Sequence, residues 1–267
     1  MDVERRTLGF TGISLPPLGL SASQPFNVIG KESQSSRASL VRAAIDRGID
    51  LFSTSPDFGE AERILAAGLI GYRHRALVMS TIRTEDITVS YRQIDMSLHL
   101  FDGRVDLIVA GSQALSDELL TSVSRMRSSG EASAIGIECQ SLEALRSIAP
   151  IVTAEGIDLL SISSALLLNP ETPQLLTKTL PPQCGVVAYV PDGMEGVASP
   201  GLDDLKLNVA GHGLRTLGDV LLKLATSDPR IMSVTIPARR IRDLDRFEDI
   251  VYSPPLSESE MAALRTG

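Results

Sequence analysis

Short runs of apolar residues alternate along the chain with longer segments in which apolar residues recur every three or four positions. The short runs are rich in valine, isoleucine, leucine and small residues, a composition that favours buried β-strands. In the longer segments, the three- and four-residue spacing predicts amphipathic helices. The pattern predicts eight strands, at residues 15–21, 50–55, 76–82, 105–111, 132–139, 158–165, 185–191 and 233–238.

Helical patterns separate these strands, and several have recognisable ends. Gly48 and Gly130 each follow a helical pattern, where glycine tolerates the left-handed conformation of a helix cap. Near the C-terminus, Ser257 and Glu260 have the spacing of a capping box and predict a terminal helix. The segments with helical spacing are 39–45, 62–69, 89–100, 118–126, 142–148 and 214–224.

Eight strand-then-helix units predict an α/β chain whose residues 1–267 form a single parallel (β/α)8 TIM barrel. An open doubly wound sheet is the alternative, but no Gly-x-Gly-x-x-Gly sequence follows any predicted strand. In such barrels the chemistry sits at the C-terminal ends of the strands. We therefore expect a small-molecule ligand at that face.

Composition narrows the range of partners. The formal net charge of −8 argues against nucleic acid as the main partner. No apolar run reaches about 18 residues, so no membrane span is expected, and the charged first residues do not form a secretory signal. Only two cysteines, Cys139 and Cys184, are present, which indicates a reducing cytoplasm rather than a disulfide framework. No paired histidine, cysteine or carboxylate spacing predicts a metal site.

Five stretches, in chain order, resemble segments of the aldo-keto reductases and together extend over nearly the whole sequence. The first resembles that family's opening hairpin and first strand, and the last resembles its eighth strand and the start of the segment that clasps the cofactor. The resemblance implies a barrel with an N-terminal hairpin and a C-terminal helix. The stretches are residues 6–20, 44–52, 133–137, 187–196 and 228–240.

Aldo-keto reductases transfer a hydride from a nicotinamide cofactor to a carbonyl, while a tyrosine tuned by lysine, aspartate and histidine protonates the oxygen. Their motif Phe-Asp-Thr-Ala, two residues, then Tyr-Gly, corresponds here to Phe-Ser-Thr-Ser-Pro-Asp-Phe-Gly at residues 52–59. The resemblance thus places Ser53 at the aspartate, Phe58 at the tyrosine, Ile82 at the lysine and Gly111 at the histidine. No lysine lies near the third strand and no histidine near the end of the fourth, so a shifted alignment does not restore the set. Because Phe58 has no hydroxyl, we expect that the standard mechanism does not operate.

The resemblance also implies NADP as a cofactor. Tyr189 occupies the place where the family stacks a ring on the nicotinamide, and Gly193 lies in the loop that follows. A core tyrosine is the alternative for Tyr189. Arg239 and Arg240 stand where the family clasps an adenosine phosphate, which a planar guanidinium can bind bidentately. A solvated pair at a helix start is the alternative for the two arginines.

Other polar residues are expected at the C-terminal face and can carry different chemistry. Arg83 offers a fixed positive charge for an anionic ligand, and Glu138 and Asp57 are candidates for moving protons. The alternatives are a salt bridge or solvated rim for Glu138 and a helix N-terminal charge for Asp57. Cys139 has no histidine nearby in the sequence to activate it, and a small buried apolar residue is its alternative.

Two classes of function remain open at this stage. One is an enzyme that acts on a small molecule, either an oxidoreductase with another proton donor or a non-redox lyase or isomerase. Arg83 would anchor an anionic ligand, and Glu138 or Asp57 would move protons. The other is a catalytically inactive binding or regulatory pseudoenzyme. The sequence does not indicate an oligomeric state.

Overall fold

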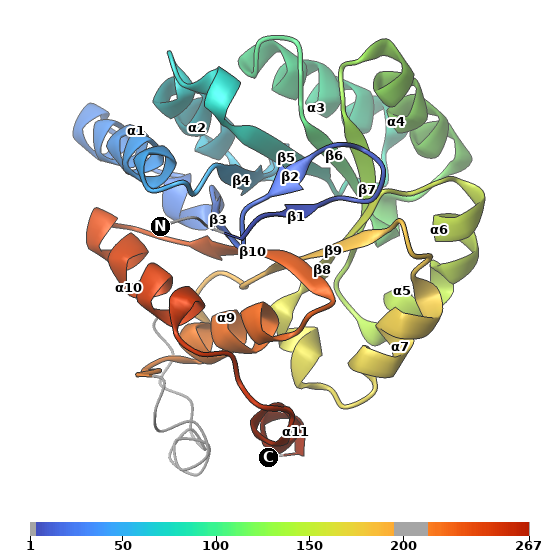
Figure 1. Cartoon of the computed structure of the whole chain (residues 1–267). Helices are drawn as coiled ribbons and strands as arrows, with labels where there is room; N and C mark the ends of the chain where they lie inside the picture. Colours follow the sequence, from blue (N-terminus) through green and yellow to red (C-terminus); the bar gives the residue numbers. More distant parts are fainter. Residues whose placement is uncertain (1–3, 195–212, 267) are drawn as a thin grey trace.

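The structure, a computed structural model, describes residues 4–194 and 213–266. Eight parallel strands close into a barrel in the order β10-β3-β4-β5-β6-β7-β8-β9, so the last strand pairs with the first (Figure 1). This confirms the predicted (β/α)8 barrel; residues 195 and 196 of the stretch 187–196 lie outside the described part. The barrel strands are β3 (Leu18–Ser21), β4 (Leu51–Thr54), β5 (Leu77–Ile82), β6 (Leu107–Gly111), β7 (Ala134–Cys139), β8 (Leu159–Ser163), β9 (Gly185–Tyr189) and β10 (Ile231–Pro237).

Helices surround the barrel, and their ends follow the sequence signals. Gly48 (φ 82°) and Gly130 (φ 84°) adopt the left-handed conformation directly after α1 and α4, as predicted. Glu260 accepts a hydrogen bond from the backbone N–H of Ser257 (2.8 Å) at the start of α11. The helices are α1 (Lys31–Asp46), α2 (Ala61–Leu69), α3 (Ile87–Leu100), α4 (Asp117–Ser129), α5 (Leu142–Ser147), α6 (Ala149–Ala154), α7 (Thr172–Thr179), α9 (Leu217–Ser227), α10 (Ile241–Tyr252) and α11 (Glu258–Thr266). None of the helices in the described part is long and apolar enough to cross a membrane.

The predicted first strand, 15–21, is divided in two. Its beginning belongs to a hairpin in which β2 (Ser14–Leu15) pairs antiparallel with β1 (Arg6–Thr7), and its end is β3. Pro16 and Pro17 separate the two strands, because a proline has no N–H for a strand ladder. Figure 1 shows the hairpin crossing one end of the barrel.

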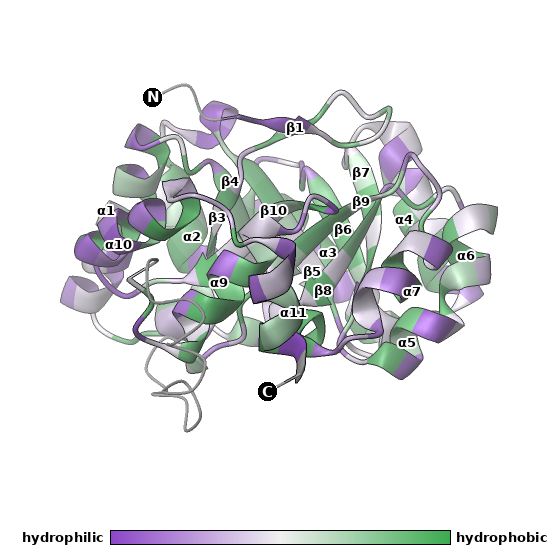
Figure 2. Cartoon of the chain, turned by 60° about the horizontal axis from the view of Figure 1, so that its bottom comes forward, coloured by the Kyte–Doolittle hydropathy of each residue, from purple (hydrophilic) through white to green (hydrophobic). Residues whose placement is uncertain are grey.

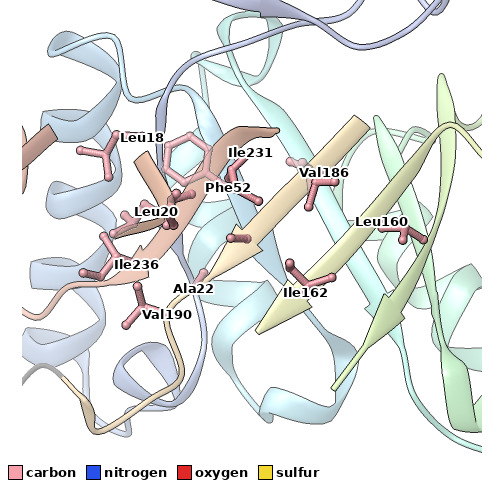
Figure 3. Packing of buried hydrophobic residues seen from close by; sticks show 14 of the residues in the cluster. Leu18, Leu20, Ala22, Phe52, Leu160, Ile162, Val186, Val190, Ile231 and Ile236 are labelled. Atoms are coloured by element: carbon pink, nitrogen blue, oxygen red, sulfur yellow. The ribbon is translucent and has the colours of Figure 1, made fainter. Parts of the chain in front are cut away.

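The barrel interior near this hairpin is apolar. Leu8, Ile13 and Leu15 of the hairpin region pack with Leu51 and Leu107, which point inward from β4 and β6. A second, larger apolar layer lies between the strands and the helices (Figures 2 and 3) and includes Leu20, Phe52 and Ile236. The hairpin therefore closes the N-terminal end of the barrel, which leaves the C-terminal end for a ligand.

Along most strands the side chains alternate between these two layers, as the pleat of a strand requires, whereas β10 has a register shift between Ile231 and Ser233. On β5, Met79 belongs to the inner cluster, while Val78 and Ile82 belong to the outer one. This register decides which residues at the strand ends face a ligand and which face the helices.

Candidate active site

A cavity of about 500 Å³ opens at the C-terminal end of the barrel. This volume lies within the range of small-molecule sites. Residues that end the strands form its walls, and residues of the following loops form its rim, as predicted for this fold. The walls are formed by Ser21, Ser53, Thr81, Glu138, Ser161, Ser163 and Tyr189, and the rim includes Gln24, Asp57, Phe58, Arg83, Gln140 and Asp192.

Hydroxyl groups dominate the walls. The Ser53 hydroxyl donates a hydrogen bond to Oγ1 of Thr235 (2.9 Å), which ties β4 to β10 across the interior. Ser161, on β8, is only 1% exposed and lines the cavity, and its hydroxyl has no hydrogen-bond partner among the described residues. A hydroxyl that lines the cavity in this way is available to a polar ligand.

An ion pair spans the cavity from β5 to β7. Nε of Arg83 donates to Oε2 of Glu138 (2.8 Å), and its Nη2 donates to Oε1 (2.7 Å). The side-chain amide of Gln140 also donates to Oε2 of Glu138 (2.9 Å). Glu138 is 1% exposed, so this bidentate pair compensates a carboxylate that water does not reach. The remaining nitrogen of Arg83, Nη1, is buried and has no partner in the described part of the chain.

Two further carboxylates stand at the rim without a cationic partner among the described residues. Oδ1 of Asp57 accepts a hydrogen bond from the side-chain amide of Gln93 (2.7 Å). Asp192, after β9, accepts one from the Ser23 hydroxyl (2.5 Å) and a longer one from the Gln24 N–H (3.4 Å). The contact between Ser23 and Asp192 joins the loops that follow β3 and β9.

Three of the four residues at the reductase tetrad positions lie near the cavity, and one expectation is wrong. Ser53 and Phe58 line the cavity. A Cβ atom on Gly111 would approach the side-chain amide of Gln113 to 2.9 Å, so Gln113 fills the space beside this position. Ile82, however, points away from the cavity into the outer apolar layer, and is 0% exposed.

The cavity-facing residue at the end of β5 is Thr81 rather than Ile82. Successive residues of a strand point to opposite faces, so an assignment shifted by one residue exchanges the two layers. Met79, two residues before Thr81, belongs to the inner cluster, which agrees with this register. Sequence reasoning also missed Gln140, since a lone polar residue in a loop carries no motif.

The residues predicted for a cofactor fall into two groups. Tyr189 lines the cavity, and burial, followed by the charge of Glu138, raises its pKa above the ordinary value of a tyrosine. Gly193 lies just beyond, in a turn with φ of 87°. Arg239 and Arg240 are exposed at the start of α10 and do not line the cavity.

A basic cluster, Arg37, Arg239 and Arg240, surrounds the start of α10. Nη1 of Arg37 donates to the carbonyl of Arg239 (2.5 Å), and burial, followed by the charge of Arg239, lowers the pKa of Arg37. The backbone N–H groups of Arg239 and Arg240 both donate to Oδ2 of Asp243 (2.9 Å each). The two backbone amides at the start of this helix therefore already bind a carboxylate.

Cys139 does not face the cavity. Its side chain belongs to the outer apolar layer and is 0% exposed, and burial raises the pKa of the thiol to about 12. This arrangement supports the buried apolar alternative over a nucleophile. No group of metal-binding side chains occurs among the residues that the structure describes.

Solved aldo-keto reductases have the same architecture. The thermostable aldo-keto reductase Tm1743, in complex with the inhibitor epalrestat, superimposes with a TM-score of 0.79 and 19% sequence identity, over 98% of this chain and 99% of its own. An aldo-keto reductase from Klebsiella pneumoniae in complex with NADPH has a TM-score of 0.76 and 17% identity, over 99% of this chain and 94% of its own. The holo form of AKR11C1 from Bacillus halodurans has a TM-score of 0.74 and 16% identity, over 98% of this chain and 95% of its own.

By sequence, no protein-family model and no curated protein matches this chain. The likeness therefore lies in the barrel and extends over the whole length of both chains. The chain has the fold of the aldo-keto reductases.

Proposed function

We propose that the protein binds NADP(H) and a small molecule at the mouth of the barrel, and acts on that molecule without the tyrosine-centred proton transfer of the aldo-keto reductases. The observation that carries this proposal is the position of Tyr189 in the wall of a polar cavity. Its strand, β9, pairs with β10, which leads into the basic cluster. Solved neighbours with the same fold contain NADPH or NADP.

Each end of the cofactor has candidate residues on this chain. The guanidinium groups of Arg239 and Arg240 would hold the adenosine phosphate, with Gly193 in the connecting turn and Tyr189 beside the nicotinamide. The walls offer Ser161 and Gln140 for the carboxamide, since Glu138 is already bonded to Arg83 and Gln140. Bound NADPH would supply a hydride.

Hydride transfer to a carbonyl also requires a proton for the oxygen, and here that proton would have to come from a group other than the tyrosine of the reductases. Ser53, Phe58, Thr81 and Gly111 include no side chain that ionises near neutral pH. Both oxygens of Glu138 accept from Arg83, so this residue positions the guanidinium and has little capacity to accept a proton from substrate. Asp57 is the better candidate to deliver that proton as a general acid, because no described cation pairs with it.

Cofactor titration tests the proposal directly. At a 100-fold excess over the dissociation constant, NADPH should stabilise the protein by about 2.7 kcal/mol, which thermal unfolding would detect. The double variant Arg239→Ala/Arg240→Ala should weaken NADPH more than NADH, because only NADPH carries the extra phosphate. Arg125→Ala, an exposed arginine on α4, is the matched control. Absence of a shift with either cofactor would exclude the proposal, and equal loss of both would refute the phosphate assignment.

A binding or regulatory pseudoenzyme is the second candidate. It is favoured by the bonding of Glu138, whose two oxygens accept three hydrogen bonds from Arg83 and Gln140. This candidate predicts NADPH binding without NADPH oxidation when a panel of aldehydes and ketones is added. Turnover that disappears in Asp57→Asn but persists in the control Asp95→Asn would reject the pseudoenzyme and support the enzyme.

A further inference from the structure

The charges at the mouth of the barrel are unbalanced. Four charged side chains line the cavity: Asp57, Arg83, Glu138 and Asp192. Arg83 and Glu138 neutralise each other through two hydrogen bonds. Asp57 and Asp192 accept only from uncharged donors of the described chain. The described lining therefore carries an excess of two negative charges.

We propose that the small molecule bound at this mouth is a cation, an amine with hydroxyl or carbonyl groups, rather than an anion. Asp57 and Asp192 would attract its ammonium group from the loops after β4 and β9. An anion would meet two carboxylates, and two of the three guanidinium nitrogens of Arg83, the cation expected to bind it, already donate to Glu138. In a concave site that excludes part of the solvent, charge of one sign selects a ligand of the opposite sign.

The cavity walls supply a second, independent indication of a polar ligand. Ser161 is 1% exposed, lines the cavity and has a hydroxyl without a partner among the described residues. A hydroxyl that lines a cavity and has no partner in the described chain can bond to a ligand with polar groups of its own. Tyr189 adds aromatic surface to the same cavity, and such a ring also attracts cations.

This inference deepens the proposed function, because it rests on the mouth as the ligand site. It also divides the C-terminal face of the barrel into two regions of opposite charge. The basic cluster at α10 suits phosphates, and the mouth suits a cationic ligand. Cofactor binding is tested with NADPH alone, so the failure of one proposal can be distinguished from the failure of the other.

Three probes of similar shape and different charge test the inference: tyramine, tyrosol and para-hydroxyphenylacetate. They carry an ammonium, a neutral hydroxyl and a carboxylate on the same phenol. By calorimetry or ligand-observed NMR at pH 7 and low salt, tyramine should bind most tightly and para-hydroxyphenylacetate most weakly. Added salt should weaken tyramine more than tyrosol, because screening acts only on the charged ligand.

Variants assign the effect to the two carboxylates. Asp57→Asn and Asp192→Asn should each weaken tyramine about fivefold, and the double variant about 25-fold, while tyrosol stays unchanged. Asparagine can still accept the hydrogen bonds of Gln93 and Ser23, so the loops should keep their structure. Asp95→Asn, an exposed carboxylate on α3, is the control. The inference is overturned if none of the probes binds, if para-hydroxyphenylacetate binds as well as tyramine, or if the double variant leaves tyramine binding unchanged.

Discussion

The guanidinium of Arg83 lies 5.0 Å from the centre of the Phe58 ring. This cation–π contact places a charged group over the ring that corresponds to the reductase tyrosine, and the same guanidinium is bonded to Glu138. Arg83 therefore joins the loop after β4 to the end of β7 across the mouth. The contact gives the Phe58 ring a packing partner that requires no hydroxyl on the ring.

The first prediction concerns the energetics of this ion pair. Glu138→Leu should lower the free energy of unfolding by about 3 kcal/mol, because it leaves the guanidinium of Arg83 partly buried without its partner. Arg83→Met should lower the free energy of unfolding by a similar amount, because it leaves the buried carboxylate of Glu138 without its partner. The double variant should lose less than the sum of the two, and about 1 kcal/mol in total, since neither charge remains to be desolvated. Urea unfolding of the four proteins measures the cycle; additive losses would contradict a direct pair.

The second prediction uses two adjacent residues of β5 that face opposite layers. Thr81→Lys should be tolerated within about 1 kcal/mol, because its side chain points into an open, polar cavity. Ile82→Lys should prevent folding or cost more than about 4 kcal/mol, because it places a charge in the apolar layer between strand and helices. Circular dichroism and thermal melting compare the pair. An equal loss of stability from both substitutions would contradict the register, in which Thr81 faces the cavity and Ile82 faces the outer apolar layer.

The sequence predicted the architecture well because short apolar runs, the helical spacing between them and the helix-cap residues are all local signals. All eight barrel strands were found, and only Pro16 and Pro17 divided one of them in an unexpected way. The prediction for Ile82 failed by a single residue, which local composition does not resolve because both faces of a buried strand are filled. The pairing of Arg83 with Glu138 joins positions 55 residues apart, so no sequence pattern announced it.

The third prediction concerns the two thiols. Cys139 and Cys184 are both buried, and burial raises the pKa of each thiol to about 12. The thiolate is the reactive form, so neither residue should react with iodoacetamide in the native protein at pH 8. Both should react after unfolding in guanidinium chloride, which serves as the control. Mass spectrometry reads the labelling, and rapid native modification of Cys139 would reopen the nucleophile interpretation.

The last prediction concerns a carboxyl group behind the barrel wall. Glu62, on α2, is 2% exposed, and its oxygens accept hydrogen bonds from Ser80 of β5 (2.8 Å) and Ser97 of α3 (2.9 Å). Burial raises the pKa of Glu62 from its ordinary value of 4.5 to about 7, against the smaller opposing effect of the two serines. The folded protein thus retains a proton on Glu62 that the unfolded chain has already released.

This difference fixes the sign of the pH dependence. Between pH 4.5 and about 7 the folded state binds more protons at Glu62 than the unfolded state, so the free energy of unfolding should fall as the pH rises. The full effect of this one group is about 3 kcal/mol. Glu62→Gln keeps one acceptor oxygen for a serine, its amide N–H can donate to the other serine, and the charge is removed, so it should stabilise the protein at pH 8 and flatten its stability profile. Glu85→Gln, in an exposed loop, should leave the profile unchanged, and a Glu62→Gln protein that is less stable than the wild type at pH 8 would show that the buried carboxylate has a partner that compensates its charge.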